Sequence, residues 1–246
     1  MQQVDSFNKI FSKKKRVLFV FAHPDDAEIY CGGTIARLVE DEKSVRLIKM
    51  TTGNKGSRQQ AIAEEELAKT RETEDAEGLK ILGLSSSDSE NLNIGDGQVE
   101  ASLATVERLT SIIRSFKPDL VVTHNPEKIL IRDTQGNYYV NHRDHRNTAI
   151  GVVDAVYPYS RDVLFFPDQL DNTHQSHTVT EFLFVDSWDS QDTVYINVTS
   201  FAQKRTQAIA AHSSQYSLDH AQRSTDYFAP LKDGKRFEQF RYVVTD

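Results

Sequence analysis

The residues best suited to chemistry form the segment His23-Pro24-Asp25-Asp26, directly after the apolar run 17–22. An imidazole and a carboxylate three positions apart are both ligand types that a divalent zinc ion accepts. Proline and aspartate are also frequent in turns, and aspartate often caps a helix. Taken alone, the segment is consistent with either a metal site or a turn.

A second cluster, His142-Arg143-Asp144-His145, opens a predicted helix. Residues three apart on a helix are neighbours, with Cβ atoms about 5–6 Å apart, so the two histidines would project together. With His23 and Asp26, His145 would complete a set of three ligands with one open coordination position, as in a catalytic zinc site. A polar helix start is the alternative interpretation.

The elements that must position these residues alternate along the chain. Apolar runs predict buried strands at 17–22, 45–51 and 120–123, and helical spacing predicts helices at 31–41, 58–82 and 103–116. This alternation predicts an α/β, Rossmann-like fold, a mostly parallel sheet with helices on both faces. Without a repeat or a linker, we expect one domain over residues 1–246.

Later segments are assigned from the same patterns. We predict a loop at 85–97, helices at 148–157 and 201–212, and strands at 163–166, 181–185 and 194–198. The segment 126–141 has a turn composition at 133–137 between apolar residues. It is interpreted as a β-hairpin, a substrate lid, or both.

Composition narrows the function classes. The formal net charge of −7 argues against nucleic acid or an anionic membrane as partner. We expect a cytoplasmic protein, since no signal-peptide pattern and no apolar run of about 18 residues is present. The single Cys31 excludes an intrachain disulfide and a multi-cysteine metal cluster. The sequence also lacks HExxH, GxSxG, P-loop and GxGxxG patterns, which disfavours metalloprotease, serine hydrolase and nucleotide-binding readings.

Two motifs resemble those of the PIG-L/LmbE family of zinc-dependent de-N-acetylases: AHPDDAEIYCGGT at 22–34 and HRDH at 142–145. Weaker similarity at 71–83, 204–215 and 237–240 extends the resemblance over nearly the whole chain. It implies hydrolysis of the N-acetyl group of an N-acetylglucosamine-type sugar or small conjugate. Two features depart from the family pattern: Arg143 stands where the family usually has proline, and the 126–141 segment is long. Both bear on the shape of the substrate more than on the chemistry.

The resemblance also implies roles for individual residues. It makes His23, Asp26 and His145 the ligands of Zn²⁺ and Asp25 the general base. His142 would be the second catalytic group, acting as an imidazolium oriented by Asp144.

Three further residues are candidates for substrate binding. His124 follows the strand 120–123 and so lies at a carboxyl end, although a turn or cap role explains it equally well. Arg71 is a candidate through the resemblance, against the alternative of a solvated helix residue. Asn54 lies in the loop after the strand 45–51.

Two other functions stay open: an amidase acting on another small N-acyl substrate, and a metal-dependent binding protein without catalysis. The presence of both Asp25 and His142 disfavours the binding protein, because metal binding alone needs neither. The expected partner is a small amino-sugar substrate, and the resemblance suggests a homo-oligomer. The group attached to the sugar is not determined by the sequence.

Overall fold

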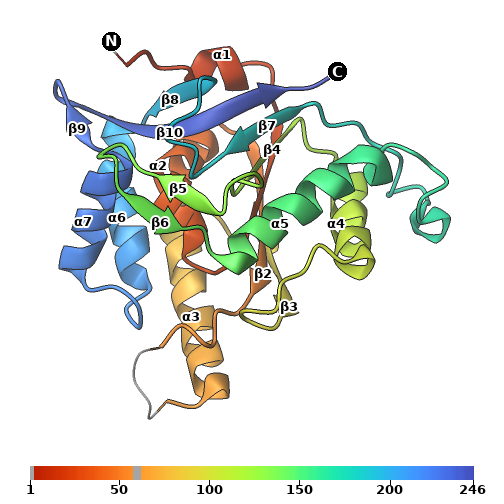
Figure 1. The fold of residues 1–246 in the computed structure, drawn as a ribbon, viewed down its shortest axis with the longest axis horizontal. Coiled ribbons are helices and arrows are strands. Elements are labelled where there is room, and N and C mark those ends of the chain that lie inside the picture. Colours follow the sequence, from red (N-terminus) through yellow and green to blue (C-terminus); the bar gives the residue numbers. More distant parts are fainter. Residues whose placement is uncertain (1–2, 58–61) are drawn as a thin grey trace.

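The computed structural model describes residues 3–57 and 62–246, with an eight-stranded sheet at its centre (Figure 1). The strands are β1 (Arg16–Phe21), β2 (Ser44–Thr51), β3 (Ser89–Ile94), β4 (Leu120–Thr123), β7 (Glu181–Phe184), β8 (Thr193–Asn197), β9 (Leu231–Lys232) and β10 (Lys235–Val244). Their order is β3-β2-β1-β4-β7-β10-β8, with β9 paired to β10. The first five run parallel, and β10 is antiparallel to both neighbours. The predicted α/β fold with a mostly parallel sheet is confirmed.

Helices cover both faces of this sheet. They are α1 (Phe7–Phe11), α2 (Asp26–Glu40), α3 (Glu64–Leu82), α4 (Leu103–Phe116), α5 (Arg143–Asp154), α6 (Ala202–Ala211) and α7 (Leu218–Phe228). Figure 1 shows α6 and α7 on one side and α4 and α5 on the other. None of the helices in the described residues is long and apolar enough to cross a membrane.

The central strand β1 explains why two cores form. Phe19 and Phe21 pack into one apolar cluster with residues of α2, while Leu18 and Val20 pack into a second cluster with residues of α4. Successive side chains of a strand point to opposite faces, so a strand covered on both sides must be apolar throughout. This explains the uninterrupted run in the sequence.

The strand order also fixes where the site lies. From β1 the chain adds β2 and β3 on one side, and β4 and β7 then extend the sheet on the other. The loops after β1 and β4 therefore leave the same sheet edge at the point where the order reverses, which is where open α/β sheets bind ligands. A hydrogen bond of 3.2 Å from the Ala22 N–H to His124 Nε2 joins the two loops.

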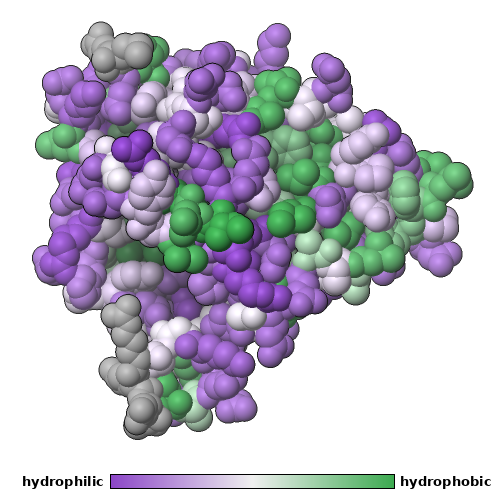
Figure 2. Space-filling model, in the orientation of Figure 1, coloured by the Kyte–Doolittle hydropathy of each residue, from purple (hydrophilic) through white to green (hydrophobic). Residues whose placement is uncertain are grey.

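The segment 126–141 contains the predicted hairpin. Strands β5 (Leu130–Arg132) and β6 (Tyr138–Val140) pair antiparallel, and the Asp133 N–H donates to the Asn137 carbonyl at 2.9 Å across the turn. Leu130 and Val140 are more than half exposed, and Figure 2 shows apolar surface over the hairpin near the centre of the view.

The predicted strand at 163–166 is wrong. Arg114, fully buried on α4, donates to the backbone carbonyls of Tyr159 (2.8 Å), Phe165 (2.8 Å) and Phe166 (3.1 Å). These bonds hold the segment in an irregular loop, and Phe166 adopts a left-handed φ of 48°. The apolar pattern alone does not reveal this long-range clamp.

Other boundaries also differ from the prediction. The predicted loop at 85–97 contains the strand β3. Its residues are mostly polar, so it lacks the apolar alternation that predicts a strand. The helices expected at 31–41 and 148–157 begin earlier, at Asp26 and Arg143. The helix predicted over 58–82 is seen from Glu64, and residues 58–61 lie outside the described residues. Helix α7 and strand β10 were not predicted.

A buried ion pair ties the C-terminal strand to α6, and its carboxylate also binds α2. Arg205 Nε on α6 lies 3.0 Å from Glu238 Oε1 on β10, and both side chains are fully buried. The Glu238 carboxylate also accepts the backbone N–H groups of Gly33 (2.8 Å) and Thr34 (2.7 Å). Each charge is therefore compensated only while the other is present.

We predict that Glu238→Ala destabilises the fold by about 3–5 kcal/mol, because it leaves the buried Arg205 charge unpaired. Guanidinium-induced unfolding measures this free energy. Arg223→Ala is the control, since it removes an exposed pair with Asp219 on α7 and should change stability little. Equal effects of the two substitutions would contradict the prediction.

Candidate active site

Three predicted metal ligands converge at the sheet edge. His23 Nδ1 lies 3.2 Å from His145 Nε2 and 3.4 Å from Asp26 Oδ2, and His145 Nε2 lies 3.2 Å from Asp26 Oδ1. A tetrahedral zinc ion bound at about 2.0–2.1 Å separates its ligand atoms by roughly 3.3 Å. The chemistry and spacing of these donors therefore fit a zinc ion.

The second nitrogen of His23 faces two carboxylates. Nε2 lies 3.4 Å from Asp96 Oδ1 and 3.6 Å from Asp144 Oδ2. Burial lowers the pKa of His23, but the hydrogen bonds of Asp144, Asp26 and Asp96 outweigh it and raise the pKa well above the usual value. Carboxylates in this position fix the ring of a ligating histidine. The sequence does not single out Asp96, because the strand β3 that precedes it lies in the segment 85–97 predicted as a loop.

His124 lies beneath the ligands instead of in the pocket. It is fully buried, its ring stacks on His145 at 3.8 Å, and its Nε2 lies 3.3 Å from Asp26 Oδ2. Burial lowers the pKa of His124 to about 3, so the ring is neutral. The predicted substrate contact is therefore not supported, and His124 instead packs against two metal-ligand candidates.

Asp25 is held by two side chains on one of its oxygens. Its Oδ2 accepts from the Tyr216 hydroxyl at 3.0 Å and lies 3.0 Å from Arg71 Nη2. Among the contacts of the described residues, none uses Asp25 Oδ1. Asp25 lines the pocket, so this arrangement fixes the carboxylate and leaves one oxygen for a reacting group.

Arg71 lines the pocket, so its predicted substrate contact stays a prediction, and the structure adds contacts with the protein itself. The side chain is buried, and its Nη1 donates to the Gly53 carbonyl at 2.8 Å while Nη2 pairs with Asp25. Gly53 has a φ of 63°, and a Cβ there would lie 2.0 Å from Arg71 Nη1. Glycine is thus required where the loop crosses Arg71, and Arg71 positions Asp25.

Tyr216 reaches Asp25 because α3 anchors the segment that precedes it. Glu74 accepts hydrogen bonds from Ser213 Oγ (2.9 Å) and from the Ser214 N–H (2.6 Å). Arg71 and Glu74 are three apart on α3 and so lie on one face. No motif in the sequence singles out Tyr216.

His142 caps α5. Its Nδ1 accepts the Asp144 N–H at 3.1 Å, so the proton of the neutral ring is on Nε2. Burial, and then the nearby His23 and His145, lower the pKa of His142. The expected imidazolium is not supported. The Asp144 carboxylate accepts the Gly97 N–H at 2.6 Å beside His23, and it makes no hydrogen bond to His142 among the described contacts.

These groups line an open pocket of about 590 Å³. Its lining is His23, Asp25, Asp26, Ile29, Tyr30, Lys55, Gly56, Arg71, Asp96, Gly97, His142, His145, Tyr216, Ser224 and Phe228. Asn54 is not in this lining, and its amide instead donates to Glu64 at 3.3 Å. The loop after β2 contributes Lys55 and Gly56 to the pocket, but not Asn54. The predicted substrate contact of Asn54 is therefore not supported.

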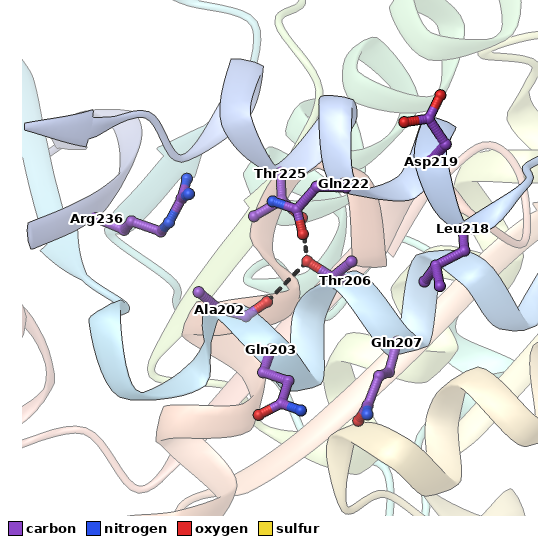
Figure 3. Close-up of a pocket in the computed structure, with 9 residues that line it drawn as sticks. All are labelled: Ala202, Gln203, Thr206, Gln207, Leu218, Asp219, Gln222, Thr225 and Arg236. Carbon is purple, nitrogen blue, oxygen red and sulfur yellow. Dashed lines mark hydrogen bonds between the residues drawn. The ribbon is translucent and has the colours of Figure 1, made fainter.

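A wider groove of about 800 Å³ lies between α6 and α7 (Figure 3). It is lined by Ala202, Gln203, Thr206, Gln207, Leu218, Asp219, Gln222, Thr225 and Arg236. This lining contains one carboxylate and no histidine, so it offers no set of metal ligands. The groups suited to hydrolysis lie in the smaller pocket.

The model of the PIG-L family, described as GlcNAc-PI de-N-acetylase, matches residues 18–156. The chain belongs to this family. Both predicted motifs fall within the match, and the family is one of de-N-acetylases. The resemblance read from the sequence is confirmed.

Curated relatives in other organisms carry deacetylase names. The chain is similar to a diacetylchitobiose deacetylase of Thermococcus kodakarensis, 24% identical over 86% of this chain and 74% of that protein. A 1D-myo-inositol 2-acetamido-2-deoxy-alpha-D-glucopyranoside deacetylase of Segniliparus rotundus is 34% identical over 57% of this chain and 50% of that protein.

Solved structures share the fold. N,N'-diacetylchitobiose deacetylase from Pyrococcus horikoshii has a TM-score of 0.80 at 24% identity, covering 99% of this chain and 95% of that one. GalB, a 4-carboxy-2-hydroxymuconate hydratase from Pseudomonas putida, has a TM-score of 0.75 at 19% identity, covering 94% and 97%. The same fold therefore carries different reactions, and the site must decide between them.

We predict roughly one zinc ion per chain in the wild type and a large loss of zinc in His145→Ala, because three protein ligands are the usual minimum of a catalytic zinc site. Metal analysis after dialysis measures this content. His174→Ala, which alters a histidine outside the pocket, should keep its zinc. Full zinc content in His145→Ala would remove that residue from the ligand set.

Proposed function

We propose that this chain is a zinc-dependent hydrolase that removes the N-acetyl group from an N-acetylglucosamine-type sugar or small conjugate. The observation that carries the proposal is the three-donor set of His23, Asp26 and His145 next to the clamped carboxylate of Asp25. Membership in a family of de-N-acetylases supports the reaction. The names of the relatives support the sugar class.

The ligand set and the base have separate tasks. Zn²⁺ held by His23, Asp26 and His145 would lower the pKa of bound water to about 7 and make hydroxide available. Asp25 accepts a proton from the attacking water through the oxygen that Tyr216 and Arg71 leave free. The new bond forms between the water oxygen and the acetamide carbon.

His142 acts at the other end of the acetamide. Its neutral ring carries the proton on Nε2, which can donate a hydrogen bond to the carbonyl oxygen as negative charge develops there. When the carbon–nitrogen bond breaks, the amine takes the proton stored on Asp25, and acetic acid and the free amino sugar leave. The acetic acid then loses its remaining proton to solvent and becomes acetate.

A mass-spectrometric screen for acetate release tests the proposed function. The panel contains N-acetylglucosamine, its disaccharide, and its inositol and malate conjugates, with N-acetylated amino acids as the comparison. Release from at least one sugar conjugate is expected. Release only from the amino acids would instead indicate an amidase, and binding without release would indicate a metal-dependent binding protein.

We predict that Asp25→Asn lowers kcat by about 10²–10⁴, the usual contribution of a general base. His142→Ala should lower kcat by about 10²–10³, the usual contribution of one hydrogen-bond donor to a developing oxyanion. Both variants should keep their zinc, because neither residue belongs to the proposed ligand set. Turnover on the identified substrate and metal content measure the two effects. Near-normal turnover of either variant would show that its assigned role is wrong.

The hairpin generates a prediction about specificity. The Tyr227 hydroxyl on α7 donates to Asp133 Oδ2 at 3.0 Å, and the next residue, Phe228, lines the pocket. Shortening the turn 133–137 while keeping β5 and β6 should therefore change the preference among sugar conjugates. Kinetics on the conjugate panel measure this change, with zinc content as the control. An unchanged profile would assign the hairpin to structure or to a subunit interface.

A further inference from the structure

One wall of the active-site pocket comes from α7, an element outside the residues 18–156 that the family model matches. Ser224 and Phe228 both line the pocket, and residues four apart on a helix lie on the same face. Leu218 and Gln222 instead line the groove toward α6 (Figure 3). The helix thus directs one face into the active site.

Aromatic rings lead from the metal ligands to this wall. The ring of Tyr30 lies 6.1 Å from the ring of His145 and 5.1 Å from the ring of Phe228, to which it is nearly perpendicular. Both Tyr30 and Phe228 are half-buried and line the pocket. Phe228 therefore contacts a ring that itself contacts a metal-ligand candidate.

Phe228 is also fixed in place. Its ring contacts Trp188 at 5.7 Å and Tyr227 at 4.9 Å. Tyr227 is bonded to Asp133 of the hairpin turn. The ring is thus held by contacts from other parts of the chain, so a ligand that packs on it need not order it first.

Ser224 provides a polar group one turn away. Its Oγ is buried and makes no hydrogen bond within the described part of the chain. The adjacent Thr225 differs, because its Oγ1 is bonded to Thr206 Oγ1 at 2.8 Å. A buried hydroxyl without a partner costs free energy, so rotation of the Ser224 side chain toward a ligand hydroxyl that pairs with it is favoured.

We propose that Ser224 and Phe228 form a subsite for a second pyranose ring attached to the acetamido sugar. The aromatic ring packs on the apolar C–H face of this sugar, and Ser224 Oγ bonds one of its hydroxyls. The inference rests on the proposed function, which places the acetamido group at His23, Asp26 and His145. The group attached to the acetamido sugar is then a sugar ring, and not a linear or highly charged group.

Calorimetric titration of the zinc-loaded Asp25→Asn protein tests the subsite, because this variant binds substrate with little turnover. The disaccharide of N-acetylglucosamine should bind about tenfold more tightly than the monosaccharide, as expected when one face of a ring is buried. Adding Phe228→Ala should reduce this ratio to near one with monosaccharide affinity unchanged. Adding Ser224→Ala, which removes only a hydroxyl, should reduce the ratio severalfold.

Two controls sharpen the test. Phe165→Ala removes an aromatic side chain outside the pocket and should leave the ratio unchanged. The octyl glycoside of N-acetylglucosamine replaces the second ring by an alkyl chain and should gain less than the disaccharide.

The subsite would be overturned if the Asp25→Asn protein bound the disaccharide and the monosaccharide about equally. It would also be overturned if neither Phe228→Ala nor Ser224→Ala changed the ratio of these two affinities. An equal gain from the octyl chain would overturn its specificity for a sugar ring. Failure of the proposed function is distinct, because it would appear as absent acetate release by the wild type whatever the binding ratio.

Discussion

The carboxylate of Asp26 contacts three histidines that come from three different elements. His23 follows β1, His124 follows β4 and His145 lies in the first turn of α5, and each has a ring nitrogen within 3.4 Å of Asp26. Burial opposes the charge of Asp26, but the nearby His145 keeps the pKa of this carboxyl well below the usual value. Because a buried charge is tolerated only with such partners, these elements must meet around it.

Asp25, the proposed base, depends on a second, independent support. Helix α3 contributes Arg71 to Asp25 and Glu74 to the segment that carries Tyr216. Asp25 and Asp26 are adjacent in the chain, yet one is fixed by α3 and the other by the histidines. Two neighbouring carboxylates can therefore take different roles, one as ligand and one as base, because different surroundings orient them.

The C-terminal third of the chain adds to the site without supplying metal ligands. Glu238 on β10 accepts two backbone N–H groups of α2, and α7 presents Phe228 to the pocket. The two sequence motifs therefore depend on β10 for support of α2 and on α7 for part of the pocket wall. The proposed metal ligands and base come from the segment after β1 and from α5.

The sequence by itself determined the parallel sheet and the hairpin, because apolar periodicity and turn composition are local properties. It grouped His23, Asp26 and His145 through the resemblance to a family, since residues so far apart in the chain are related by no local spacing. Only the tertiary structure decided that Arg71 pairs with Asp25, that His124 is buried and that Asp144 faces His23. The sequence also missed Asp96 and Tyr216, and it misread 163–166, where Arg114 binds the backbone. Each of these depends on contacts between residues far apart in the chain, and the partner of a polar side chain is set by packing that no local pattern encodes.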